Sequence, residues 1–140
     1  MTVMQRLGGF TLKEYKSAIN FVTIPLPMIT LNRYIAIERG NRFGGASEKK
    51  RVTRLAAEYV TKAMANGAVF KWGKPLQFDW YCINKRTDPD NIAFQHKFVF
   101  DGMMQAGFLT NDNWDNIVEL RDRFFIDKAN PRVEVYEIDE

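Results

Sequence analysis

Residues 76–91 read LQFDWYCINKRTDPDN and decide the fold, because they carry a β-strand pattern directly into a helix start. In the run Leu76–Asn84, large apolar residues first occupy every second position, which indicates a strand with one buried face. Asp88 can accept hydrogen bonds from the free amides of a first helical turn, and Pro89 suits that turn because it lacks an amide hydrogen. We therefore predict a strand over Leu76–Asn84 and a helix that starts near Asp88 or Pro89 and ends at Gly107.

Strand and helix patterns occur on both sides of this segment, without an internal repeat or a linker. They predict a strand at Asn20–Ile24, a cationic loop at Leu31–Ala46, a helix at Ser47–Asn66, and strands at Ile117–Asp127 and Arg132–Ile138. The order β-α-β-α-β-β predicts a single α/β (α+β) domain over residues 1–140, with a mixed β-sheet and two helices packed against it. We expect about the first fifteen residues to be poorly ordered.

The net charge of +3 hides a strong asymmetry along the chain. Residues 1–87 carry 15 basic and 5 acidic side chains, whereas residues 88–140 carry 5 basic and 12 acidic ones. A cationic half favours binding to a polyanion such as nucleic acid, and it leaves the acidic groups for another task.

Several classes of protein are excluded by the sequence. It contains no apolar run of the roughly 20 residues that cross a bilayer, and charged residues interrupt its start, where a secretory signal would be apolar. We therefore expect an intracellular, cytoplasmic protein with no membrane partner. The single cysteine, Cys82, is expected to be a buried structural thiol. Cys82 and the single histidine, His96, cannot form a zinc site together, so any metal must be held by carboxylates.

Asp88 and Asp90 place two carboxylates one residue apart at the predicted junction between strand and helix. Two such groups repel each other unless a cation lies between them, and Mg²⁺ prefers oxygen ligands of this kind. The adjacent helix N-terminus offers amide groups to a phosphate. The same residues also suit a helix-capping turn, so the spacing alone leaves a metal site and a structural cap both open.

Lys97 follows Asp90 by seven residues and precedes Asp101 by four, which aligns the three side chains on one face of a continuous helix. This alignment predicts a cation beside the carboxylates, able to neutralise charge on a phosphate. An ordinary Lys97–Asp101 pair within the helix is the alternative. His96 points about 100° away from Lys97 on such a helix, so we expect a surface or packing role for His96 rather than that of a general base.

The stretch from Asp88 to Asn116 resembles the RusA-like Holliday junction resolvases of bacteria and their phages. The similarity lies in Asp-x-Asp-Asn, a following helix that contains Lys and Asp-Gly, the run Ala-Gly-Phe-Leu and a short acidic turn. It is strongest over residues 84–126 and weaker around residues 25–27 and 32–34. The family is described as a homodimeric α/β endonuclease that uses three aspartates and a lysine with magnesium.

The resemblance implies a magnesium-dependent endonuclease that resolves Holliday (four-way) junctions by symmetric nicking, in DNA recombination and repair. It implies Asp88 and Asp90 as paired metal ligands, Asp112 as the third carboxylate, and Lys97 as the catalytic lysine. Lys97 lies three residues farther from Asp90 than the lysine of the best-known members, and an Asn-Asp pair stands where members often have Asp-Asp. Asp115 is therefore an alternative third ligand.

A homodimer suits this activity, because two symmetric nicks require two equivalent sites related by a two-fold axis. Basic side chains would hold the DNA through its phosphates, which positions the substrate without reading its sequence. These are Arg33, Arg39, Arg42, Lys49, Lys50, Arg51, Arg54, Lys85 and Arg86. Two alternatives stay open: a nuclease for other branched DNA such as forks and flaps, and a noncatalytic phage DNA-binding module whose aspartates only cap a helix.

Overall fold

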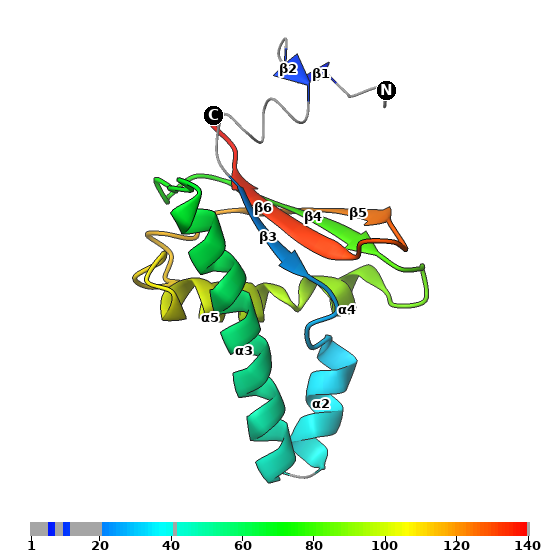
Figure 1. The fold of residues 1–140 in the computed structure, drawn as a ribbon. Coiled ribbons are helices and arrows are strands. Elements are labelled where there is room, and N and C mark those ends of the chain that lie inside the picture. Colours follow the sequence, from blue (N-terminus) through cyan, green and yellow to red (C-terminus); the bar gives the residue numbers. More distant parts are fainter. Residues whose placement is uncertain (1–5, 8–9, 12–20, 41, 140) are drawn as a thin grey trace.

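The computed structural model describes residues 6–7, 10–11, 21–40 and 42–139 (Figure 1). Its elements are β1 (Arg6–Leu7), β2 (Phe10–Thr11), β3 (Phe21–Pro25), α2 (Leu31–Arg39), α3 (Arg42–Ala65), β4 (Leu76–Cys82), α4 (Pro89–Ala93), α5 (His96–Gln105), β5 (Leu120–Ile126) and β6 (Arg132–Glu137). β1 and β2 form a separate antiparallel pair, and the other four strands form one sheet in the order β3-β6-β4-β5.

β4 lies inside the sheet and pairs with a strand on each side. It runs antiparallel to β6 and parallel to β5, while β3 and β6 are antiparallel to each other. A parallel pair needs a crossover connection, and α4 and α5 supply it between the end of β4 and the start of β5. The predicted single domain with a mixed sheet and packed helices is confirmed at this level.

The hydrophobic core lies between the sheet and the helices, which cover one of its faces (Figure 1). Leu76, Phe78 and Trp80 of β4 are fully buried there, but the prediction of a single buried face is wrong, because Gln77 and Asp79 on the other face are buried as well. α3 and α5 approach each other closely over this core, because α5 has a glycine at the contact. A Cβ atom added to Gly102 would lie 2.6 Å from the Cβ atom of Ala56 on α3.

The prediction of a cationic loop at Leu31–Ala46 is wrong, because this segment forms α2 and the start of α3. Thr30 caps α2 by accepting a hydrogen bond at 3.4 Å from a backbone amide of its first turn. One of the glycines that indicated a loop, Gly45, instead allows two helices to touch, since a Cβ atom on it would lie 2.2 Å from Cγ2 of Ile37. α2 and residues 42–54 of α3 form a helical hairpin that projects away from the sheet (Figure 1).

The prediction of a single helix that ends at Gly107 is wrong, because the segment forms two helices, α4 and α5, with a break at Gln95. The Gln95 amide donates to the carbonyl of Ile92, three residues back rather than four, which tightens the turn. The buried Gln95 side chain holds this turn in place: its Nε2 donates to the same carbonyl at 3.1 Å, and its Oε1 accepts from the Met28 amide at 2.8 Å. The apolar spacing continues through the break, so periodicity could not reveal it.

The remaining predicted elements are present with ends shifted by a few residues. The expectation of poor order over the first fifteen residues concerns a segment that lies largely outside the described residues. Within residues 21–40 and 42–139, no helix is long and apolar enough to cross a membrane.

Candidate functional site

Asp88 and Asp90 lie where β4 has ended and α4 begins, and both side chains are exposed. Asp88 is the residue that precedes the helix, with an extended backbone, yet its side chain makes no capping hydrogen bond. Asp90 accepts a hydrogen bond at 3.0 Å from the amide of its neighbour Asn91. Neither carboxylate forms an ion pair with any residue that the structure describes. The pair therefore carries two negative charges that the described part of the chain leaves uncompensated.

α4 is tied to the base of the helical hairpin. The Asn91 side chain accepts a hydrogen bond at 2.8 Å from the backbone amide of Asn32, in the first turn of α2. Tyr34 of α2 packs against Phe94, with ring centroids 5.2 Å apart, just after α4. These contacts fix the acidic end of α4 relative to the cationic hairpin.

Lys97 lies on α5 and pairs with Asp101, with 3.5 Å between the ammonium nitrogen and a carboxylate oxygen. The predicted alignment of Asp90, Lys97 and Asp101 assumed one continuous helix, and the break at Gln95 removes that regular spacing. The contact that the structure shows for Lys97 is the ordinary pair between residues four apart, which the sequence left as an alternative.

Asp112 lies at the opposite end of the parallel strands from Asp88. The loop before β5 is bonded to the chain near the start of β4, because the Gly73 amide donates to the Asn116 carbonyl at 2.9 Å. Asp88 instead follows the end of β4, and the loops occupy opposite ends of the sheet in Figure 1. Asp115 lies in the same loop as Asp112, so neither candidate third ligand joins the pair within one chain. Among the described residues, no group of three or more acidic, histidine or cysteine side chains converges.

A hollow of about 370 Å³ lies between the start of α4 and the end of β5, and neither Asp88 nor Asp90 lines it. Pro89 and Phe124 line it together with Lys85 and Thr87. Its lining is mostly apolar with a few polar groups, a composition that is typical of sites that hold an organic ligand.

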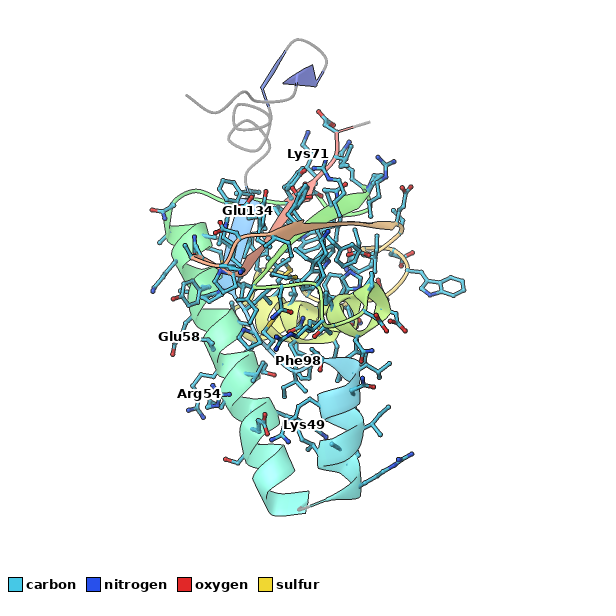
Figure 2. All side chains as sticks on the ribbon, turned by 90° about the vertical axis from the view of Figure 1, so that its right-hand side faces the viewer. Lys49, Arg54, Glu58, Lys71, Phe98 and Glu134 are labelled. Carbon is cyan, nitrogen blue, oxygen red and sulfur yellow. The ribbon has the colours of Figure 1, made fainter. Side chains whose placement is uncertain are left out.

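The basic residues expected to bind DNA fall into two groups. Arg33, Arg39, Lys49, Lys50, Arg51 and Arg54 lie on the helical hairpin, and Lys85 and Arg86 lie in the loop between β4 and α4. The side chain of Arg42 lies outside the described residues. Figure 2 shows Lys49 and Arg54 on the part of α3 that extends beyond the sheet.

Some of these cations are already paired. Arg33 forms an ion pair with Glu48 at 2.9 Å, and a hydrogen bond with Glu38 raises the pKa of Lys49. The others make no ion pair within the described part of the chain: Arg39, Lys50, Arg51, Arg54, Lys85 and Arg86. A second hollow, of about 410 Å³, is lined by Lys49, Lys50, Thr53 and Arg54 of α3 and by Gln105 of α5. Its positive charge suits a phosphate.

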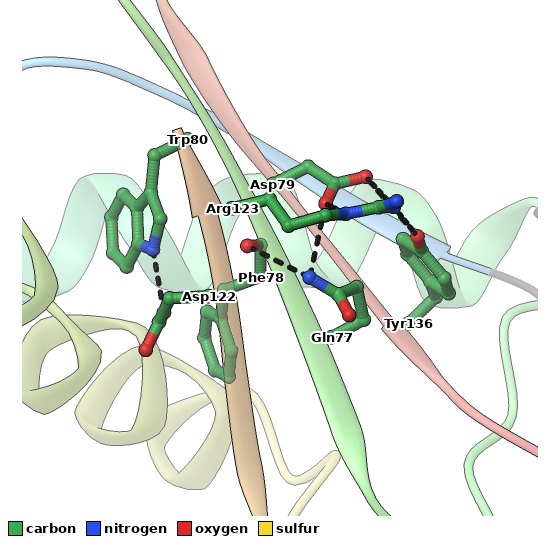
Figure 3. Close-up of polar contacts among 7 residues, drawn as sticks. All are labelled: Gln77, Phe78, Asp79, Trp80, Asp122, Arg123 and Tyr136. Carbon is green, nitrogen blue, oxygen red and sulfur yellow. Dashed lines mark hydrogen bonds and ion pairs between the residues drawn. The ribbon is translucent and has the colours of Figure 1, made fainter. Parts of the chain in front are cut away.

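Sequence reasoning missed a polar cluster on the face of the sheet opposite the helices (Figure 3). Asp79 of β4 is fully buried and accepts hydrogen bonds from Gln77 at 3.2 Å, from the Tyr136 hydroxyl at 3.1 Å and from Arg123. Burial, followed by the charge of Asp79, raises the pKa of Tyr136. The sequence did contain an indication of this cluster, because Asp79 is a charged residue inside a strand and its neighbours at 78 and 80 are aromatic. This cluster joins three strands and lies away from the exposed carboxylates.

His96 packs against aromatic rings and contacts a carboxylate, and Cys82, which we expected to be buried, is half-buried. His96 Nε2 lies 2.7 Å from Asp122 Oδ1, and the same oxygen accepts a hydrogen bond from the Trp80 indole at 2.7 Å. The His96 ring lies 4.4 Å from that of Phe78. Burial raises the pKa of the half-buried Cys82, which disfavours the thiolate that a nucleophile needs.

The described geometry thus places two uncompensated carboxylates after the loop that carries Lys85 and Arg86, and a second group of cations on the helical hairpin. It separates these from the third predicted carboxylate. Comparison with known proteins adds no further constraint: no family model matches this chain, and no curated protein matches it either.

Proposed function

We propose that this protein is a magnesium-dependent, structure-specific endonuclease that nicks branched DNA, with the four-way junction as its substrate. The observation that carries the proposal is the state of Asp88 and Asp90, which flank Pro89 and are exposed and without a cationic partner in the described chain. A structural cap would use the Asp88 side chain on the helix amides, and that bond is missing.

Magnesium fits the donor set at this position. Mg²⁺ takes oxygen ligands, and it is often held by one or two carboxylates together with substrate phosphates and water. Asp88 and Asp90 would hold it, and their mutual repulsion would be relieved. When bound, the ion supplies Lewis-acid chemistry, which lowers the pKa of a water nucleophile and stabilises charge on the scissile phosphate.

The chain's own residues would position the DNA around this pair. Lys85 and Arg86 precede Asp88 by three and two residues, so they could bind a phosphate near the carboxylates. The helical hairpin offers a second cationic surface, joined to α4 through the bond between Asn91 and Asn32. Two separated phosphate-binding surfaces suit a substrate whose strands diverge, as at a junction. Lys97 remains our candidate for further charge stabilisation, in which case its pair with Asp101 would have to open.

A nuclease assay with four substrates tests this proposal. Purified protein is incubated with labelled four-way junction, fork, flap and linear duplex, with Mg²⁺ or with EDTA. We expect paired symmetric nicks in the junction only, and only with Mg²⁺. Asp90→Asn should abolish cleavage and keep junction binding, while Asp139→Asn, which removes an exposed acid paired with Lys74, should cut like the wild type.

Each other outcome has a distinct meaning. Magnesium-dependent cutting by Asp90→Asn contradicts the assigned site. Equal cutting of forks and flaps identifies a nuclease for branched DNA in general. Binding without any cutting identifies a noncatalytic DNA-binding module.

A further inference from the structure

β5 is an edge strand with an apolar surface. It is the outermost strand of the sheet, and within the described chain no strand pairs with its outer side. Four of its seven residues have large hydrophobic side chains that are exposed, namely Leu120, Phe124, Phe125 and Ile126. Edge strands are usually protected by charge, proline or a covering segment, because an apolar edge invites pairing with another strand.

The backbone of β5 leaves a row of hydrogen-bonding groups on this edge. The Glu119 carbonyl accepts from the Leu76 amide, and the Asp127 amide donates to the Cys82 carbonyl, so the backbone groups of Glu119 and Asp127 point toward β4. Because successive residues alternate, the backbone groups of the even-numbered residues point to the open edge, where the described chain offers them no strand. These groups belong to Leu120, Asp122, Phe124 and Ile126.

The hollow of about 370 Å³ lies at the end of this edge. Phe124 and Ile126 line it from β5, and Pro89 and Ile92 line it from α4. The exposed fractions of Phe124 and Ile126 are 38% and 44%, so both residues present apolar surface to the solvent. A hollow between an edge strand and a helix can hold an extended chain whose alternate side chains point into it.

Lys85 gives this hollow a positive charge. It lines the hollow from the loop that follows β4, and its side chain forms no ion pair with the described residues. The loop lies beyond the end of β5, because the last residue of β4, Cys82, is bonded to Asp127. Among the described residues, no acidic side chain lines the hollow. A ligand that carries an acidic group at this end is therefore complementary in charge.

We propose that the edge of β5 binds an extended peptide segment of a partner protein, which joins the sheet as a fifth strand. Apolar side chains of the segment lie opposite Phe124 and Ile126, and an acidic side chain pairs with Lys85. Because side chains on one face of a strand recur at every second position, the segment has the pattern apolar-x-apolar-x-acidic along its path toward Lys85. Backbone hydrogen bonds supply affinity, and the side-chain pattern supplies selectivity.

A second copy of β5 fits this edge less well than such a peptide. Full antiparallel overlap of two β5 strands about a two-fold axis sets Asp122 of each copy opposite Phe124 of the other. Asp122 already contacts His96 and Trp80, and the overlap would cover its carboxylate with an apolar ring that offers no hydrogen bond. A peptide with its own sequence avoids this conflict.

Selection from a library of random peptides displayed on phage tests this surface. The target is the purified full chain without DNA or metal, so the result does not depend on the proposed function. We expect the enriched sequences to share the apolar-x-apolar-x-acidic pattern in one chain direction. A selection that enriches no sequence, or only sequences without this pattern, overturns the proposal.

Variants of the edge locate the bound peptide. Fluorescence anisotropy of a labelled synthetic copy of an enriched peptide gives its dissociation constant. The double variant Phe124→Lys, Ile126→Lys should raise this constant by at least about tenfold, because it places charge in the apolar hollow. Val69→Lys is the control, since Val69 is an exposed hydrophobic residue outside β5, and circular dichroism checks that each variant folds. Equal affinity of the double variant and the control contradicts binding at β5.

A charge reversal at Lys85 tests the position of the acidic side chain and leaves the apolar edge intact. Lys85→Glu should weaken binding of the enriched peptide by about tenfold. The same variant should regain affinity for a peptide in which lysine replaces the acidic residue. A Lys85→Glu variant that keeps the preference for the acidic peptide overturns the proposed pairing.

Hydrogen exchange of individual amides distinguishes strand addition from docking of side chains alone. Peptide binding should slow exchange at Phe124 and Ile126, whose amides point outward, and leave Arg123, whose amide points toward β4, unchanged. Unchanged exchange at the outward amides overturns strand addition. Analytical ultracentrifugation tests for the other occupant: a mass of twice 16.3 kDa that the double variant halves would show that a second copy covers the edge, and would overturn the proposal.

Discussion

Asp79 is fully buried, and its carboxylate lies 3.0 Å from Nε and 3.2 Å from Nη2 of Arg123 on the neighbouring strand. This pair joins β4 to β5 on the face that the helices do not cover, and Tyr136 of β6 extends it to a third strand. It has a structural role, because a buried carboxylate without a cation is costly.

Arg123→Met should therefore lower the free energy of unfolding by about 3 kcal/mol, the low end for breaking a buried pair, because the Arg123 side chain is 37% exposed. Urea unfolding followed by circular dichroism measures the change. Arg54→Met, which removes an exposed arginine, should change stability by less than about 0.5 kcal/mol. Equal stability of the two variants would show that the pair with Asp79 contributes nothing.

The raised pKa of Tyr136 predicts a loss of stability at alkaline pH. The folded protein keeps the phenol protonated at a pH where the unfolded chain loses that proton, so the stabilising effect is complete below about pH 10 and declines above it. Tyr136→Phe should reduce this decline. The measurement compares unfolding free energies of both proteins from about pH 8 to about pH 11, a range that spans the ordinary tyrosine pKa. Parallel curves would mean that Tyr136 is not responsible.

Gly102→Ala should destabilise the contact between α3 and α5. The added methyl group would lie 2.6 Å from the Cβ atom of Ala56 and 3.0 Å from backbone atoms, which cannot move as a flexible side chain can. We expect a loss of about 1–3 kcal/mol, despite the higher helix propensity of alanine. Gln105→Ala on the same helix is exposed and should be near neutral. A Gly102→Ala variant as stable as the wild type would contradict the close approach.

Asp88→Asn separates a functional carboxylate from a structural cap. Because the Asp88 side chain makes no capping bond, this change should alter the free energy of unfolding by less than about 0.5 kcal/mol while abolishing cleavage. Thermal unfolding and the junction assay are measured on the same preparation. A loss of about 1 kcal/mol with unchanged cleavage is the result expected of a cap.

Binding of a four-way junction should depend steeply on salt. A variant that makes one fewer bond to a DNA phosphate should have a slope of log affinity against log salt that is shallower by about 0.9. Two side chains of the helical hairpin that make no ion pair in the described chain are Lys50 and Arg54. Lys50→Ala and Arg54→Ala should each reduce the slope by up to that amount. Lys74→Ala should leave the slope unchanged, because Lys74 is already paired with Asp139. Slopes that stay unchanged in both Lys50→Ala and Arg54→Ala would exclude the hairpin from DNA binding.

The sequence by itself predicted a strand over Leu76–Asn84, which the structure ends at Cys82, a helix start near Asp88 or Pro89, and the separation of charge along the chain. These features depend on neighbours within a few residues, through alternation, capping chemistry and composition. The helical hairpin was missed because Gly44 and Gly45 are also loop residues. Only the contact of Gly45 with Ile37 shows why a helix needs glycine there.

The tertiary structure alone decided which carboxylates can meet. Asp112 follows Asp90 by 22 residues, a spacing that is compatible with either end of the sheet. The parallel pairing of β4 with β5 fixes it at the far end, because a crossover must return the chain to the start of the next strand. The buried pair of Asp79 and Arg123 was hidden for the same reason: pairing between distant strands is set by the whole sheet, and no local pattern encodes it.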